Sequence, residues 1–265
     1  MDSLLHAFLL SIVQGLTEFL PVSSTGHLII TSALLGLTDQ KIATFNVLIQ
    51  LGSIMAVVLL YRQRFLGLVK AQPHVRFSGL RGLYLLALTC LPACLLGFVA
   101  HKYIKHYLFN PTSVALALGF GALCMLGVER YMSRRKPLVH SLDEFTPALA
   151  LGVGLFQCLA LWPGFSRSAS TIMGGMILGA RRGLAAEYSF IAAVPIMAAA
   201  TGYDLLKSWS LFSMADLPFC AVGLIGAFVS AWFAIKGFIA LLGRMNLVPF
   251  ALYRLLLAPL VYYFM

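Results

Sequence analysis

The chain has 265 residues, of which 60% are apolar and only 11% are charged, and its mean hydropathy is +0.91. Soluble globular chains carry roughly 45–50% apolar and about 25% charged residues, so this composition excludes a soluble fold of this length. The net charge is +10. Its basic residues lie in short connectors between apolar stretches and not on an aromatic-interleaved face, which argues against nucleic acid as a partner.

Six apolar stretches are long enough to cross a hydrocarbon core of about 30 Å, which takes about 20 residues. In chain order they cover residues 42–61, 82–100, 113–128, 187–206, 217–236 and 247–264. Two more apolar stretches, 4–37 and 147–180, are each interrupted by a polar break with proline, serine and glycine. The sequence therefore predicts an all-α polytopic membrane protein with six transmembrane helices and two broken segments.

The placement of basic residues predicts how the chain crosses the membrane, because lysine and arginine favour cytoplasmic loops. Connectors 62–81 and 129–136 are rich in both, whereas those near 101–112 and 207–216 hold few. We therefore expect loops 62–81, 129–146 and 237–246 in the cytoplasm. Both termini then lie outside.

The chain reads as one membrane domain, 1–265, built from two halves at approximately 1–128 and 147–265. Shifting the sequence by 143 positions lays Gln14 on Gln157 and Ser23 on Ser166, and each copy runs from a broken apolar segment into a full span. The predicted sides of the loops are consistent along the chain only if each broken segment enters and leaves the membrane on the same side. We expect re-entrant helical hairpins in inverted-topology repeats, an arrangement that places polar sites near the bilayer midplane.

The first break joins a carboxylate to a hydroxyl-rich helix start. Gln14 and Glu18 are four residues apart and share a helix face, and Pro21 then disfavours helix continuation. The following residues, Ser23, Ser24, Thr25 and His27, begin the next helix. A serine cap and free N–H groups at the positive end of a helix form an anion site, and the imidazole is expected within reach of it.

The second break has the same form but carries an arginine. Pro163 and Gly164 end one helix, and Ser166, Arg167 and Ser168 start another. A charge at the membrane centre costs at least about 2.5–3.5 kcal/mol, and the dipole at a helix N-terminus repels a cation. A bound anion would offset both the cost of the buried charge and the repulsion by the helix dipole, so Arg167 predicts phosphate or carboxylate binding.

Together these groups form a set suited to phosphoryl transfer. A hydroxyl or imidazole attacks phosphorus, the carboxylate takes a proton or holds a divalent metal, and the arginine stabilises the transferring oxygens. Alternatives remain open. Glu18 and Arg167 could form a structural ion pair, the serines could be ordinary helix caps, and Gln14 could join helices. Asn46 and Gln50, one turn apart in a span, are not assigned to the site.

At these breaks the chain resembles the bacterial undecaprenyl-diphosphate phosphatases, the bacitracin-resistance membrane phosphatases. The matching text is Glu18-Phe-Leu-Pro-Val-Ser-Ser-Thr-Gly-His27 and Leu161-Trp-Pro-Gly-Phe-Ser-Arg-Ser168. The resemblance extends to Phe45…Gln50-Leu-Gly-Ser53 and to the closing Pro249-Phe-Ala-Leu-Tyr-Arg254. It departs at Gln14, where many members have a second glutamate, and at Ala169, where glycine is usual.

The resemblance implies hydrolysis of the C55 polyprenyl diphosphate to its monophosphate and phosphate, which recycles the lipid carrier of cell-wall synthesis. It implies a divalent cation, Mg²⁺ or Ca²⁺, with Glu18 as its ligand, a bacterial inner membrane and a site open to the periplasm. By position, Glu18, Ser24, His27 and Arg167 are the expected catalytic residues. Gln14, Ser23, Thr25, Ser166 and Ser168 are the expected substrate-binding residues.

We favour Ser24 as the nucleophile, Glu18 as base or metal ligand and His27 as proton shuttle. Two other functions compete with the enzyme: a membrane transporter or lipid flippase of broken-helix type, and an anion-binding scaffold. The serine–histidine pair beside Glu18 favours the enzyme, because binding alone needs neither a nucleophile nor a base. Polyprenyl diphosphate and membrane lipids are the expected partners, and a homodimer stays open.

Overall fold

The computed structural model describes residues 2–37 and 39–264, in which loops connect helices and the one β-type pairing is an isolated bridge between Val139 and Ala180. The α-helices are α1 (Asp2–Glu18), α2 (Ser24–Leu34), α3 (Gln40–Leu60), α4 (Arg62–Val69), α5 (Gly79–Tyr103), α6 (Pro111–Met132), α7 (Pro147–Gln157), α8 (Arg167–Ile177), α9 (Arg182–Ser208), α10 (Leu217–Leu242) and α11 (Val248–Phe264). Short turns of 3₁₀ or π type are η1 (Ile104–Leu108), η2 (Leu142–Glu144), η3 (Cys158–Leu161), η4 (Trp209–Leu211) and η5 (Met214–Asp216). The all-α prediction is confirmed.

Within the described part of the chain, five helical segments are long and apolar enough to cross a membrane. They are Gln40–Leu60, Gly79–Tyr103, Pro111–Met132, Arg182–Ser208 and Met214–Leu242. Four of them contain an expected span, and Gln40–Leu60 ends one residue before the expected end of the span 42–61. The sixth expected span forms α11, whose 17 residues extend only about 25 Å. The protein is therefore a multi-pass membrane protein, and α11 is one of its three shorter apolar helices within the described residues.

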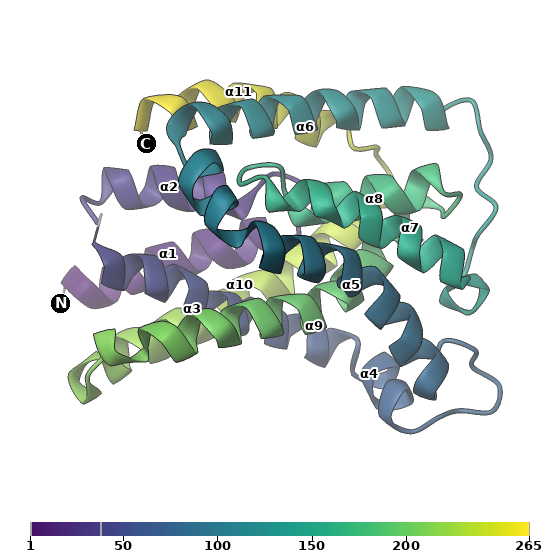
Figure 1. Ribbon diagram of the computed structural model, residues 1–265, viewed down its shortest axis with the longest axis horizontal. Helices are drawn as coiled ribbons and strands as arrows, with labels where there is room; N and C mark the ends of the chain where they lie inside the picture. The colour runs from purple at the N-terminus through teal and green to yellow at the C-terminus, as the bar shows by residue number, and fades with distance from the viewer. Residues whose placement is uncertain (1, 38, 265) are drawn as a thin grey trace.

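The two interrupted segments fold as helical hairpins whose tips meet. Helix α1 packs on α2, and α7 packs on α8. Figure 1 shows the hairpins pointing toward each other from opposite ends of the molecule. At the tips, the Ser168 hydroxyl donates to the Leu20 carbonyl over 2.8 Å. Both breaks are therefore brought to one place in the interior.

The first hairpin is held by a close helix contact. Helix α1 packs along α10, and a Cβ added to Gly15 would lie 2.5 Å from the Ala227 carbonyl oxygen. A larger side chain would separate the two helices. Because Gly15 neighbours Gln14, this contact fixes the position of the polar face of α1 along the length of α10.

The basic connector 62–81 is not wholly a loop, since its first part forms α4. A buried ion pair closes the same end of the molecule. Arg182 donates to both Glu129 carboxylate oxygens, at 2.8 and 2.6 Å, and the Leu247 amide donates to Glu129 over 2.9 Å. This pairing explains why α6 runs past residue 128 and why α9 begins before residue 187.

Candidate active site

The hairpin tips enclose a cavity of about 220 Å³ between the N-termini of α2 and α8. Its polar lining consists of Glu18, Ser23, Ser24, Thr25, Gln50, Gln157, Ser166 and Arg167. The first amides of a helix have no partner within that helix, so two helix N-termini offer N–H groups and positive dipole ends to one small space. Such a space suits an anion.

Both helix starts use the same unusual backbone. Ser23 has φ 71° and Ser166 has φ 78°, and among the described residues they are the non-glycine residues with positive φ. Each caps its helix: the Ser23 hydroxyl accepts from the Gly26 amide over 3.4 Å, and that of Ser166 accepts from the Ala169 amide over 3.3 Å. Left-handed backbone at a residue with a side chain costs about 1–3 kcal/mol and persists where the surroundings impose it.

Glu18 is the carboxylate of the cavity and accepts three hydrogen bonds. Its Oε2 atom accepts from Ser24 Oγ over 2.7 Å and from Gln14 Nε2 over 2.9 Å. Its Oε1 atom accepts from Arg167 over 3.1 Å, and the Glu18 side chain is 8% exposed. A hydroxyl in hydrogen-bond contact with a carboxylate has a base for its proton.

Arg167 reaches the cavity from the opposite hairpin. One guanidinium nitrogen donates to Glu18, and the other donates to the Ser189 carbonyl over 3.2 Å. Its Nε atom is buried and has no hydrogen-bond partner in the described structure. The ion pair that was the alternative interpretation of these two charges therefore forms, and it forms on the wall of a cavity with hydroxyl groups around it.

Gln14, an expected substrate-binding residue, lies behind Glu18, is fully buried and is not part of the cavity lining. While its Nε2 atom donates to Glu18, its Oε1 atom is buried and has no hydrogen-bond partner. The described residues contain no group of three His, Cys, Asp or Glu side chains that could hold a metal. An oxygen set of one carboxylate and one free amide oxygen still fits Mg²⁺ or Ca²⁺, since substrate phosphates commonly supply further ligands to Mg²⁺.

The position of Ser168 does not match its expected role as a substrate-binding residue. It is fully buried and is not part of the cavity lining. Its hydroxyl donates to Leu20 and lies 3.0 Å from the Ser166 hydroxyl. Because the hydroxyl is used between the tips, Ser168 joins the hairpins instead of facing a ligand. Thr25, in contrast, lines the cavity as predicted.

His27 also points elsewhere. Its Nδ1 atom lies 2.8 Å from the Ser23 carbonyl oxygen, which requires a proton on Nδ1, and its Nε2 atom lies 2.7 Å from the Tyr253 hydroxyl. The ring stacks on Tyr253 with centroids 5.5 Å apart, and His27 is not among the cavity residues. The expectation that the imidazole reaches the anion site is not met in this arrangement.

Four polar residues join the site that the sequence did not assign to it. Gln50 and Gln157 line the cavity, Ser189 binds Arg167, and Tyr253 binds His27. For the two glutamines, the sequence held a pattern that could have assigned them to the site. Gln50 is one turn from another amide in a span, and Gln157 occupies the repeat position of Gln14. The contacts of Ser189 and Tyr253 join distant parts of the chain and leave no local pattern.

Arg254 of α11 supports the tip of the second hairpin. It is fully buried, and one guanidinium nitrogen donates to the carbonyls of Ala117 and Gly164, each over 3.2 Å. Among the described residues, no carboxylate lies within ion-pair distance of it. Since Gly164 belongs to the break before Ser166, this cation holds the loop that begins α8.

A second cavity, of about 350 Å³, adjoins the first and shares Thr25 and Gln50 with it. Its walls are mainly apolar: Leu28, Ile29, Leu37, Ile42, Ala43, Val47 and Phe109. A polar cavity continuous with an apolar one matches a molecule with a charged head and an apolar chain.

Comparison with known proteins agrees with this geometry. The family model for "Bacitracin resistance protein BacA" matches residues 7–260. The chain belongs to the BacA family. This match includes both hairpins, the cavity between them and Arg254, so the BacA family model covers every residue of the candidate site.

Curated relatives resemble the chain over its whole length. A protein of Nitratidesulfovibrio vulgaris (strain DP4) is 68% identical over 265 residues, covering 100% of this chain and 99% of the relative. One of Desulfovibrio desulfuricans is 67% identical with the same coverage. One of Lawsonia intracellularis is 58% identical over 254 residues, 96% of this chain and 95% of the relative. Each of these BacA-like relatives is named undecaprenyl-diphosphatase.

Proposed function

We propose that the protein is an undecaprenyl-diphosphatase, which hydrolyses undecaprenyl diphosphate to undecaprenyl phosphate and inorganic phosphate. Relatives of that name cover 96–100% of the chain at 58–68% identity. The observation that carries the chemistry is the contact of Ser24 with Glu18 in a cavity that also holds Arg167. The reaction recycles the lipid carrier of cell-wall synthesis and accounts for the family's link to bacitracin resistance.

In the proposed reaction, Ser24 Oγ attacks the terminal phosphorus and its proton passes to Glu18. The bond from that phosphorus to the bridging oxygen breaks, and undecaprenyl phosphate leaves with the bond electrons. Glu18 gives the proton it took from Ser24 to the leaving undecaprenyl phosphate. Water then attacks the phosphorus of the phosphoserine and gives a proton to Glu18. As the bond from phosphorus to Ser24 Oγ breaks, Glu18 passes this proton to Ser24, and inorganic phosphate is released. The 2.7 Å hydrogen bond from Ser24 to Glu18 supports this pairing of nucleophile and base.

Arg167 and the two helix N-termini bind the phosphate oxygens in this scheme. The Arg167 guanidinium exchanges its contact with Glu18 for the diphosphate, and the orphan Nε–H gains a partner. Donors aimed at developing negative charge in a water-poor site are the largest single source of stabilisation in many enzymes. The neighbouring apolar cavity accepts the first prenyl units, and Ser23, Thr25 and Ser166 offer hydroxyls to the diphosphate.

Glu18 and the Gln14 amide oxygen would hold a divalent cation, Mg²⁺ or Ca²⁺, together with oxygens of the substrate. When bound, the cation neutralises charge on the diphosphate. The buried Oε1 atom of Gln14, which has no hydrogen-bond partner, supports this assignment. An amide in place of a second carboxylate lowers the negative charge of the site, so metal binding depends more strongly on the substrate.

His27 acts as a positioning residue in this proposal, and not as proton shuttle or nucleophile. Both of its ring nitrogens are engaged, one with the Ser23 carbonyl and one with Tyr253. Through Ser23 it orients the start of α2 and therefore Ser24. If His27 were the nucleophile, an acid-labile phosphohistidine would accumulate, and Ser24→Ala would retain substantial turnover.

We propose that the protein spans the bacterial inner membrane with six helices, α11 included, and that its hairpins are re-entrant halves of an inverted repeat. Figure 1 has both termini at one end of the molecule and α4 at the other. The basic residues at the α4 end support a cytoplasmic position for it. The termini then face the periplasm, as does the opening of the active site. The matching serine caps at Ser23 and Ser166 support the repeat.

Phosphate release tests the proposed function directly. Purified protein in detergent, given a long-chain prenyl diphosphate and Mg²⁺ or Ca²⁺, should release phosphate. Arg167→Ala and Ser24→Ala should each lower kcat/KM by about 10³-fold or more. The matched controls Arg134→Ala and Ser133→Ala change exposed residues at the end of α6 and should leave turnover unchanged. No release by the wild type, or equal release by Arg167→Ala, would contradict the proposal.

Lipid transport remains a second candidate because opposed broken helices are also transporter architecture. Transport requires neither a nucleophile nor a base, so Ser24→Ala would leave it intact while hydrolysis is lost. Measuring both activities on that variant in liposomes separates the two. A homodimer is also open and is tested by the mass of the protein in detergent.

A further inference from the structure

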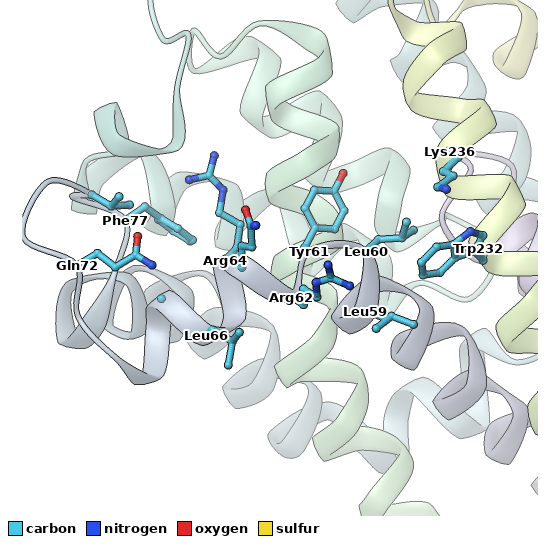
Figure 2. Close-up of a pocket in the computed structure, with 13 residues that line it drawn as sticks. Leu59, Leu60, Tyr61, Arg62, Arg64, Leu66, Gln72, Phe77, Trp232 and Lys236 are labelled. Carbon is cyan, nitrogen blue, oxygen red and sulfur yellow. The ribbon is translucent and has the colours of Figure 1, made fainter.

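A cavity separate from the active site lies at the C-terminal end of α3. It has a volume of about 830 Å³ and is formed by the end of α3, α4, the loop before α5 and the last turns of α10. Figure 2 shows its residues. It shares no residue with the active-site cavity. The proposed phosphatase reaction makes no use of it.

The lining of this cavity, which we name the α4 pocket, is basic. It includes Arg62, Arg64 and Lys236 and no acidic side chain. Arg64 lies 3.7 Å from Glu187 outside the lining. Arg62 and Lys236 are exposed, and neither has an acidic partner among the described residues. Cations gathered around a hollow attract an anion and lower their mutual repulsion by binding it.

The second feature of the α4 pocket is its aromatic side chains. Figure 2 shows Tyr61 between Arg64 and the Trp232–Lys236 pair. The Lys236 ammonium lies 4.8 Å from the centre of the Trp232 ring. Tryptophan and tyrosine at the ends of spanning helices mark the level of lipid headgroups. The α4 pocket therefore lies where a charged headgroup would be.

An apolar groove continues from the pocket. A cavity of about 360 Å³ shares Leu60, Tyr61 and Lys236 with it and adds Ile235, Ile239 and Ala240. Helix α10 supplies most of its wall, in the two turns before the helix ends at Leu242. A free phosphate ion would use only the basic part. The groove extends the site for an apolar chain.

We propose that the α4 pocket binds a lipid through its phosphate headgroup, with Arg62, Arg64 and Lys236 on the phosphate and the lipid chain along α10. Basic pockets between membrane helices are known to take anionic headgroups. Two lipids supply this chemistry, a polyprenyl monophosphate and an anionic glycerophospholipid. The site is separate from the active site, and its existence does not depend on the proposed hydrolysis.

Photocrosslinking tests the proposal. The probe is a farnesyl monophosphate with a diazirine on its chain, added to the full-length protein in detergent micelles. We expect labelled peptides from 59–77 and 228–240, in addition to peptides of the active-site hairpins, which serve as an internal control. Arg62→Gln/Lys236→Gln should reduce labelling of the first two by about tenfold or more, and that of the hairpins not at all.

The matched control, Arg130→Gln/Arg134→Gln, removes two exposed basic residues near the end of α6 and should label like the wild type. Both double variants should hydrolyse prenyl diphosphate at the wild-type rate, which shows that they are folded. Equal labelling of the α4-pocket peptides in both double variants would overturn the proposal, since a general attraction to basic loops would then explain it.

Competition identifies the source of the phosphate. Excess undecaprenyl phosphate or phosphatidylglycerol should each be tried against the probe, and protection by either supports the proposal and names the lipid. Protection by inorganic phosphate at the same concentration would contradict it, because the groove would then contribute nothing. Absence of label in 59–77 and 228–240 would also contradict it, whether or not the protein hydrolyses its substrate.

Discussion

The two hairpins share a backbone and differ in chemistry. Each has a buried glutamine before the break and a left-handed serine that caps the next helix, Gln14 with Ser23 and Gln157 with Ser166. At the position of Glu18, however, the second hairpin has Leu161. In the proposed reaction, the first hairpin holds a hydroxyl and its base, and the second holds a cation for phosphate.

This division has a physical reason. A carboxylate on both tips would repel a diphosphate, and an arginine on both would leave no base. Placing opposite charges on opposite hairpins lets them neutralise each other over 3.1 Å when the substrate is absent. The pair then opens toward phosphate, which offers the arginine a doubly charged partner.

Removing the base from the first hairpin has the largest expected effect. Glu18→Gln keeps the size of the side chain but cannot accept a proton from Ser24. We expect kcat to fall by about 10³-fold. Phosphate release under saturating substrate measures it, and Asp204→Asn, an exposed acid of α9, is the control. A decrease below tenfold would remove Glu18 from the proposed proton transfer.

Making the second hairpin resemble the first should weaken substrate binding. Leu161→Glu adds a carboxylate to the cavity wall near Arg167, where it competes with the diphosphate. We expect kcat/KM to fall by about 10²-fold, mainly through KM. Leu161→Gln, of equal size and without charge, should retain activity within about tenfold. If both variants behave alike, shape and not charge distinguishes the two tips.

The shared backbone is tested by substituting its two left-handed serines. Ser23→Val and Ser166→Val force a β-branched residue into positive φ and should each cost about 1–3 kcal/mol of stability. Ser23→Gly and Ser166→Gly should stay close to the wild type, because glycine adopts this conformation readily and replaces a cap at a cost of a few tenths of a kcal/mol. Thermal unfolding in detergent compares the four variants.

The smallest expected effect concerns the contact between the tips. Ser168→Ala removes the hydrogen bond to Leu20 and should cost about 1 kcal/mol. Ser170→Ala removes a bond within α8 only and is the matched control. A loss of stability in Ser168→Ala with unchanged KM identifies a structural residue. A large increase in KM alone would return Ser168 to the substrate.

Local patterns in the sequence predicted the elements well. Proline, glycine and consecutive serines marked both breaks, and hydropathy marked the spans, because each signal acts within a few residues. The meeting of Glu18 and Arg167 followed from opposed hairpins that bring both breaks to the interior. The positive φ of Ser23 was not predictable, since serine tolerates that region only where tertiary contacts impose it.

Side-chain direction was the part that the sequence did not contain. His27 turns away from the cavity because Tyr253, 226 residues further on, offers it a hydrogen bond and a ring to stack on. Ser168 turns toward Leu20 on the opposite hairpin. The α4 pocket also combines segments far apart in the chain, with Arg62 from one and Trp232 from another. Only the packed fold brings such residues together.

The support that Arg254 gives to Gly164 has a consequence for the order in which the molecule is made. Helix α11 leaves the ribosome after both hairpins, yet its arginine completes the loop that begins α8. A chain halted before α11 would have both hairpins inserted and an unsupported loop beside Ser166. Both hairpins are therefore synthesised before the helix that supports the second tip, and the loop beside Ser166 gains its hydrogen bond from Arg254 only once α11 has been made.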